Sequence, residues 1–206
     1  MCAKKRTRTL RCVNRSAASW IFVVSAISTI VAERRVEAAP QISSTAVVGV
    51  AGNGDRSHLW GSTDFAAGLR GEMLLGRGRD ADFGVGPYLE ALTTTGFSDV
   101  QLGGGATLLV PVHSYLPLTL SAGAFATKTD AWGWQPGLAG ELFWGSHGYN
   151  YGSIYALTAG IFAGARYGLG SSRDVSILLG ARIDLEFLAL PVILVWNAIR
   201  GSDPTR

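Results

Sequence analysis

The chain has 206 residues, enough for one domain and a targeting segment, and only 16% of them are charged, against ~25% in an ordinary soluble domain. Residues 1–38 carry eight basic and two acidic groups, which leaves ten basic and thirteen acidic groups in residues 39–206. The formal net charge of +3 therefore comes from the N-terminal segment, and we expect no nucleic-acid partner.

The first 38 residues have the order of parts found in a secretory signal peptide. Met1–Arg15 is polar and basic, Ser16–Ala32 is uncharged and mostly apolar, and the small residues near Ala38 are typical of a cleavage site. The sequence predicts a cleaved signal; the alternative is an uncleaved anchor, because the apolar run approaches the ~17 residues that can span a bilayer. Both cysteines, Cys2 and Cys12, lie in this segment, so we expect neither a disulfide nor a cysteine-bound metal beyond it, and no cofactor is indicated.

Residues 39–190 are predicted to form an all-β, antiparallel up-and-down transmembrane barrel. Segments of roughly ten to fourteen residues alternate in character between turns rich in Gly, Asp, Ser and Asn. Successive side chains of a strand point to opposite faces, so this alternation indicates strands with one apolar side. Eight segments are found, and an even number is expected when such a barrel closes. The predicted strands are Ser44–Gly52, Thr63–Leu75, Asp82–Thr93, Val100–Val110, Leu118–Lys128, Gln135–Trp144, Ile154–Tyr167 and Val175–Leu188.

Two of these strands have irregular features. Ser44–Gly52 is apolar on both faces, so the sequence does not assign which of its residues point inward. Pro87 removes a hydrogen bond from the third strand, which is typical of a bulge.

The less apolar face of the strands carries small residues and a few charges. A face turned to water would be rich in Lys, Glu, Asn and Gln, yet Lys128 is the only lysine after Lys5. We therefore predict that the apolar face meets lipid, and that the charged face fills a narrow lumen with ion pairs that hold the register. The predicted interior charge network is Arg70, Glu72, Glu90, Glu141, Arg166, Arg182, Asp184 and Glu186.

Aromatic residues gather near the ends of the predicted strands. Trp and Tyr favour the two interfaces of a membrane, where one part of the side chain is in an apolar region and another is wet. The sequence predicts two aromatic girdles, one with Trp60, Trp132, Trp134 and Tyr167, and the other with Trp144 and Tyr155.

In strand number, alternation and Arg–carboxylate interior, residues 43–188 resemble the small outer-membrane β-barrels of the OmpA/OmpX type. The resemblance implies an eight-stranded barrel in the lipid of a bacterial outer membrane, with its N-terminus in the periplasm and a role in membrane integrity, adhesion or surface interaction. It places the loops near 53–62, 94–99, 129–134 and 168–174 outside the cell. Barrels of this kind usually end on a strand, whereas residues 191–206 are predicted to form a C-terminal tail that contains a short interfacial helix.

Three functions fit this barrel. The preferred hypothesis is a non-enzymatic structural or surface-interaction role, with envelope proteins as candidate partners. A lipid-modifying enzyme is the alternative, and it requires a nucleophile and a base at the rim. His58 lies beside Asp55, Arg56 and Ser57 in an outer loop, whereas His113 and His147 lie in predicted turns at the opposite end. The third hypothesis is a narrow channel for small solutes or ions. The sequence indicates no ligand and no oligomeric state.

Overall fold

The computed structural model describes residues 39–55, 58–94, 98–129, 133–148, 154–170 and 174–201. The predicted signal peptide, residues 1–38, lies outside these ranges, and so does Trp132 of the predicted girdles.

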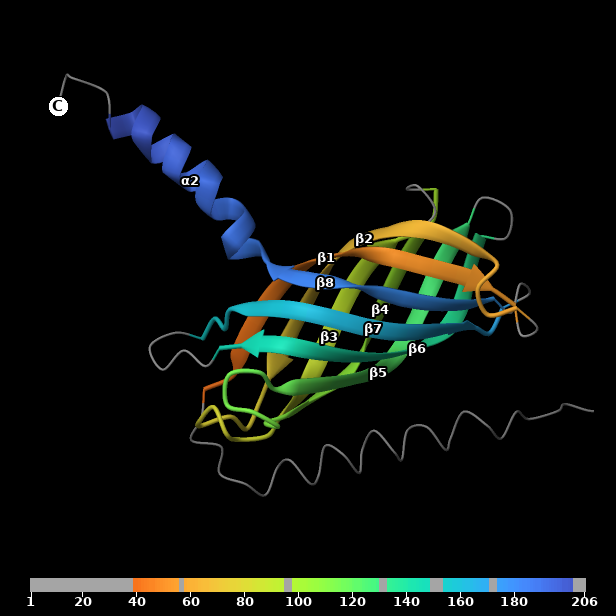
Figure 1. The fold of residues 1–206 in the computed structure, drawn as a ribbon, viewed down its shortest axis with the longest axis horizontal. Helices are drawn as coiled ribbons and strands as arrows, with labels where there is room; N and C mark the ends of the chain where they lie inside the picture. The colour runs from red at the N-terminus through yellow and green to blue at the C-terminus, as the bar shows by residue number, and fades with distance from the viewer. Residues whose placement is uncertain are drawn as a thin grey trace, which may run out of the picture. The chain divides into compact units, whose positions relative to one another are not determined.

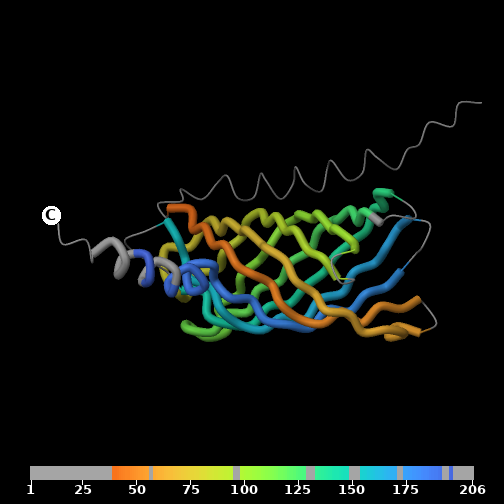
Figure 2. The backbone as a smooth tube through the Cα atoms, turned by 90° about the horizontal axis from the view of Figure 1, so that it is seen from above, coloured from red at the N-terminus to blue at the C-terminus, as the bar shows by residue number. Residues whose placement is uncertain are grey.

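Eight antiparallel strands close into one barrel (Figure 1). The strands are β1 Gln41–Gly54, β2 Ser62–Leu74, β3 Gly84–Thr93, β4 Val100–Val110, β5 Leu118–Thr129, β6 Gly133–His147, β7 Thr158–Gly168 and β8 Val175–Asp184. Each strand is hydrogen-bonded to the next, and β1 pairs with β8 from Thr45↔Asp184 to Gly54↔Val175. Figure 2 shows the strands running obliquely, as a closed sheet requires. The predicted all-β class, the strand number and the up-and-down order are confirmed.

The two ends of the barrel have different connections. We call the end that holds the β1–β2, β3–β4, β5–β6 and β7–β8 connections the mouth. The base is the end where β1 begins and β8 stops, and where β2–β3, β4–β5 and β6–β7 connect.

Burial assigns the inward face of β1, which the sequence leaves open. Thr45 and Val47 are buried, whereas Val48 and Val50 are exposed, so odd-numbered residues of β1 point into the lumen. In β2 and β8 the buried positions follow the predicted alternation. An apolar cluster inside the barrel contains Val47, Ala51, Ala66, Leu92, Phe143, Phe162 and Leu178.

Inward glycines make room for the phenylalanine rings of this cluster. A Cβ atom built on Gly180 would overlap the Val48 backbone oxygen and lie 2.8 Å from Phe162 Cε1, and one on Gly160 would lie 2.5 Å from Gly145 Cα and 2.9 Å from Phe143 Cζ. Real Cβ atoms do not approach other atoms so closely, and overpacking a core is destabilising. These two glycines therefore have a steric role, because a side chain at either position would overlap the neighbouring strand or a ring in the narrow lumen.

Pro87 does not produce the expected bulge. The β2–β3 ladder stops at Glu72↔Tyr88 and resumes at the Leu75↔Val85 bridge with the same register. On the other side, Pro87 pairs with Ala106 in an unbroken β3–β4 register. Proline lacks the N–H group that the ladder needs, so it leaves a gap in one ladder without adding a residue to the strand.

The last strand is shorter than predicted. The alternation predicts a strand to Leu188, whereas β8 ends at Asp184 and helix α2, Leu185–Gly201, follows without a loop. The predicted tail, residues 191–206, therefore holds only part of a helix that begins six residues earlier. Among the described residues, no helix is both long and apolar enough to cross a membrane.

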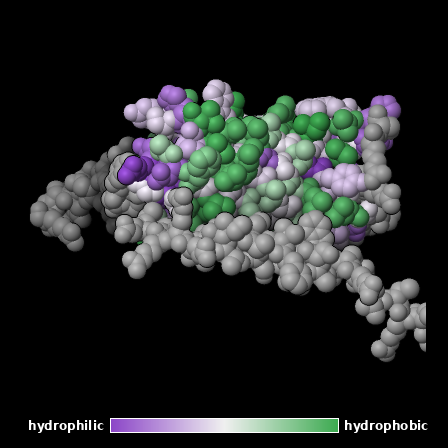
Figure 3. Space-filling model, turned by 90° about the horizontal axis from the view of Figure 1, so that it is seen from below, coloured by the Kyte–Doolittle hydropathy of each residue, from purple (hydrophilic) through white to green (hydrophobic). Residues whose placement is uncertain are grey.

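The outward face of the barrel is apolar on every strand. Large exposed hydrophobic side chains include Val48 of β1, Phe65 of β2, Leu89 of β3, Leu102 of β4, Leu120 of β5, Leu142 of β6, Ile161 of β7 and Leu179 of β8. On the face drawn in Figure 3, hydrophobic residues lie mostly across the middle of the barrel, and hydrophilic residues lie mostly toward its ends.

Candidate functional site: the barrel lumen

Six of the eight charged residues predicted to lie inside the barrel meet in its lumen. We call them the lumen network: Arg70, Glu72, Glu90, Glu141, Arg166 and Arg182. They come from five strands, because each occupies an inward position of β2, β3, β6, β7 or β8. No side chain of the network is more than 12% exposed, so the charges are largely removed from water.

Ion pairs connect the network across the lumen. Arg70 contributes Nη2 to Glu72 Oε2 at 3.3 Å and Nη1 to Glu90 Oε2 at 3.7 Å. Arg166 also pairs with Glu90. Arg182 pairs with Glu141, and its Nη1 lies 3.9 Å from Glu72 Oε2. Every carboxylate of the network therefore has an arginine partner, which a buried charge requires.

Uncharged side chains also hold these arginines. The Arg70 guanidinium lies 3.8 Å from the centroid of the Tyr88 ring and donates a 2.6 Å hydrogen bond to Ser121 Oγ. The Arg182 guanidinium lies 5.1 Å from the Phe143 ring centroid and 5.6 Å from that of Phe162. Alternation predicts that Tyr88 and Ser121 point inward, but contacts between distant strands depend on how the barrel closes.

Asp184 and Glu186, the other two predicted interior charges, have different positions. Asp184 is buried at the base, whereas Glu186 is exposed in the first turn of α2. Asp184 Oδ1 accepts a 2.9 Å hydrogen bond from the Glu186 backbone N–H. A carboxylate that accepts from the first N–H groups of a helix caps its N-terminus, so the strand ends here and Glu186 does not reach the lumen.

Tyr155, predicted as a girdle residue, is tied to the base of the barrel. Its hydroxyl donates to Asp184 Oδ1 at 2.8 Å and lies 2.9 Å from Ser44 Oγ. Asp184 Oδ2 in turn accepts the Thr158 backbone N–H at 3.1 Å. Burial raises the pKa of the Tyr155 phenol above its ordinary value. The tyrosine therefore stays a neutral donor and joins the loop before β7 to β1 and β8.

Arg77 and His147 fill the base, and the sequence does not identify either as an interior residue. His147 is the last residue of β6, so its predicted position in a turn is wrong. Its Nδ1 lies 3.5 Å from Glu72 Oε1 and 3.0 Å from Thr158 Oγ1. Arg77 follows β2, is fully buried, and donates to Gln41 Oε1 at 3.1 Å and to the His147 carbonyl at 3.3 Å. A turn residue has no alternation that would indicate its direction.

The described aromatic residues lie at both ends of the barrel. Trp60 and Trp134 are exposed and Tyr167 is half-buried at the mouth, whereas Trp144 is exposed near the base. Trp60 Nε1 donates to Thr63 Oγ1 at 2.8 Å. This arrangement matches the two positions that the sequence predicts for these residues, and their role as girdles stays a prediction.

The residues considered for catalysis are only partly described. The His58 backbone N–H donates to Asp55 Oδ1 at 2.8 Å, which is a turn contact, and Arg56 and Ser57 lie outside the described residues. His113 is exposed at the base, where its Nδ1 accepts the Tyr115 N–H at 3.3 Å. The enzyme hypothesis stays a prediction.

Free space in the barrel lies at the mouth. The described residues enclose a cavity of about 10 Å³ within the lumen network and one of about 430 Å³ at the mouth. A cavity of about 10 Å³ holds at most one water molecule, so the space among the residues of the lumen network has no room for a larger solute.

Comparisons with known proteins give no assignment for this barrel: no protein-family model matches the chain, and no curated protein matches it. Within the part of the chain that the structure describes, no group of three or more His, Cys, Asp or Glu side chains is placed to hold a metal ion.

Proposed function

We propose that this protein is a bacterial outer-membrane β-barrel with a structural or surface-interaction role and a closed lumen. The exposed apolar face carries the proposal. Leu89 is 73% exposed, Ile161 60% and Phe65 54%, and each of the eight strands contributes such a residue. A soluble monomer rarely exposes a continuous apolar surface of this extent, whereas lipid requires one.

The backbone supports the same proposal. Lipid offers no hydrogen-bond partner to the peptide groups of a strand, so a membrane sheet must have no free edge. Pairing of β1 with β8 removes the edge here. The strands contain 10 to 15 residues, and a tilted strand needs roughly 9–11 residues to cross the hydrocarbon layer. Export by the predicted signal at residues 1–38 would deliver the chain to the envelope.

The lumen network favours a closed barrel rather than a channel. Buried Arg–carboxylate pairs fix side chains that would otherwise be mobile, and the cavity of about 10 Å³ among them is too small for a solute larger than water. Eight-stranded barrels are narrow enough for side chains to fill. A structural or surface-interaction role needs no path through the middle of the lumen.

Helix α2 fits the same proposal, because its apolar residues would lie at the periplasmic surface of the membrane.

Cell fractionation followed by gel electrophoresis tests the proposal. We expect the protein in the outer-membrane fraction, and we expect its mobility in SDS to change only after boiling, because a closed barrel resists SDS. A variant that lacks residues 2–38 is the control and should remain in the cytoplasm. Full-length protein in the soluble or inner-membrane fraction, with the same mobility before and after boiling, would refute the proposal.

A further inference from the structure

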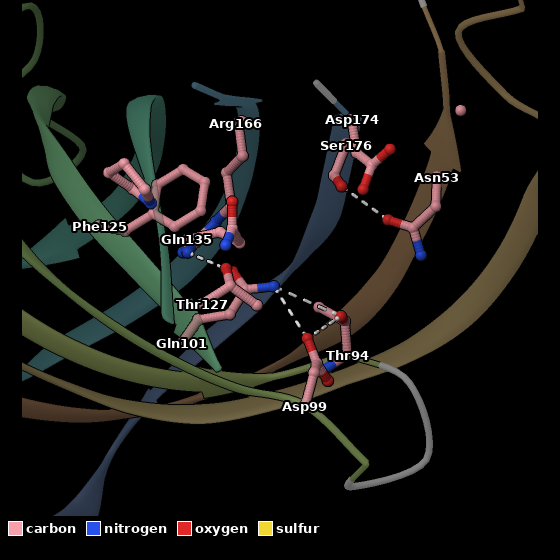
Figure 4. Close-up of a pocket in the computed structure, with 13 residues that line it drawn as sticks. Asn53, Thr94, Asp99, Gln101, Phe125, Thr127, Gln135, Arg166, Asp174 and Ser176 are labelled. Atoms are coloured by element: carbon pink, nitrogen blue, oxygen red, sulfur yellow. Dashed lines mark hydrogen bonds between the residues drawn. The ribbon is translucent and has the colours of Figure 1, made fainter. Parts of the chain in front are cut away.

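The mouth of the barrel contains a cavity large enough for a small ligand. Its volume of about 430 Å³ lies within the ~300–1,000 Å³ of small-molecule pockets. Figure 4 shows polar side chains from several strands turned toward this space, with the Phe125 ring at one side. The polar side chains that line it are Asn53, Thr94, Asp99, Gln101, Thr127, Gln135, Arg166, Asp174 and Ser176.

Arg166 supplies fixed hydrogen-bond donors to the inner part of the cavity. Its side chain is only 7% exposed, its Nη1 donates to Gln101 Oε1 at 2.7 Å, and it forms an ion pair with Glu90. A guanidinium carries five N–H donors in a rigid fork. Gln101 and Glu90 orient this fork, so the donors that they do not use are presented to a ligand without further ordering.

The walls carry acceptors that are also held in place. Asp99 accepts the Thr94 N–H at 2.8 Å, the Thr94 hydroxyl at 2.7 Å and Gln101 Nε2 at 3.0 Å (Figure 4). On another wall, Asn53 Oδ1 accepts the Ser176 hydroxyl at 2.6 Å. The cavity therefore has both donor and acceptor groups, and hydrogen bonds within its walls hold them in place.

The charges of the cavity favour a neutral ligand. Arg166 is compensated by Glu90, whereas the Asp99 and Asp174 carboxylates line the walls. An anion that approached Arg166 would be repelled by these two carboxylates, and a cation would offer no acceptor to the Arg166 donors. A hydroxyl group is both donor and acceptor, so it can use every one of these groups, while Phe125 offers a face for C–H groups.

We infer that the mouth cavity binds a small polyhydroxyl ligand, a mono- or disaccharide unit. This inference deepens the proposed surface-interaction role and rests on it for the direction in which the mouth faces. The sugar could arrive free from outside the cell or as part of a lipopolysaccharide headgroup in the same membrane leaflet, and both sources present the same hydroxyl chemistry.

Binding is tested with the full-length protein, folded in a detergent that carries no sugar, by calorimetric titration with glucose, galactose and maltose. The informative variant is Gln135→Leu, which removes a polar group from the cavity wall, and the matched control is Gln41→Leu at the base. Heat-modifiable mobility verifies that each variant is folded. Arg166→Met removes the central donors, but it leaves Glu90 with one partner fewer and could prevent folding, so Gln135→Leu decides the outcome on its own.

We expect saturable binding of at least one of these sugars, weakened about three- to tenfold by Gln135→Leu and unchanged within about twofold by Gln41→Leu. The second arm uses phosphatidylcholine vesicles with and without lipopolysaccharide. Loss of lipopolysaccharide binding in Gln135→Leu, without binding of free sugar, would assign the membrane source. A heat-modifiable, folded protein that binds neither would overturn the inference and leave the proposed barrel intact. Tighter binding of acetate or glycine than of any sugar would also overturn it.

Discussion

Replacement of Arg182 by methionine tests the structural role of the lumen network. Arg182 is 1% exposed, pairs with Glu141, and lies near Glu72 and two phenylalanine rings. Methionine keeps much of the side-chain volume but leaves Glu141 buried without its arginine. Breaking a buried pair in this way typically costs about 3–5 kcal/mol. We therefore expect Arg182→Met to lower the free energy of unfolding by that amount.

The double variant Arg182→Met/Glu141→Gln separates loss of the pair from loss of packing. Removal of both charges leaves no uncompensated ion in this pair, so most of the stability lost in Arg182→Met should return. The assay is reversible urea unfolding in lipid vesicles, followed by tryptophan fluorescence. Lys128→Met, at an exposed outward position of β5, is the control and should change stability by less than about 0.5 kcal/mol. A cost for Arg182→Met as small as that of the control, or no recovery in the double variant, would refute the reasoning.

Three further variants test other parts of the barrel by the same unfolding assay. Arg77→Ala should cost about 1.5–3 kcal/mol, because it removes charged hydrogen bonds at the base, whereas exposed Arg79→Ala should be nearly neutral. Gly180→Ala should cost about 1–3 kcal/mol because its Cβ would overlap the Val48 backbone oxygen and lie 2.8 Å from the Phe162 ring. Gly140→Ala, where the Cβ meets open space, should cost little. In the folded protein the pKa of the Tyr155 phenol is raised above its ordinary value of 10. The free energy of unfolding should therefore include the full contribution of this phenol below pH 10 and lose it as the pH rises through the folded-state pKa. Tyr155→Phe should remove the part of the alkaline loss of stability that comes from this phenol. If the unfolding free energy of the variant falls with pH as it does in the parent protein, the hydrogen bond between Tyr155 and Asp184 does not stabilise the barrel.

The faces of most strands could be predicted because alternation is a local property. Arg70 and Glu72, or Arg182 and Asp184, stand two residues apart and must share a face wherever a strand forms. The same rule could not orient β1, since Val47 and Val48 are both apolar and only the closed barrel makes one buried and the other exposed.

The rule fails where the strand stops or where contacts cross the lumen. Glu186 continues the period of two beyond Asp184, but the Asp184 carboxylate caps a helix instead. Arg77 belongs to a turn, so no periodicity indicates that it fills the base. The mouth cavity joins Asn53 to Gln101 and Arg166, and their proximity depends on the stagger of the strands around the barrel.

The central claim is that the exposed apolar face of the barrel meets lipid, and a pair of arginine substitutions tests it most directly. Leu89 lies in the middle of β3, and Leu169 lies at the mouth after β7; both are more than half exposed. In a bilayer, arginine costs about 2–4 kcal/mol at the midplane and about 0–1 kcal/mol near an interface. Unfolding free energies measured in phosphatidylcholine vesicles should therefore fall by about 2–4 kcal/mol for Leu89→Arg and by at most about 1 kcal/mol for Leu169→Arg. Small and equal effects, as expected for two water-exposed positions, would contradict the account.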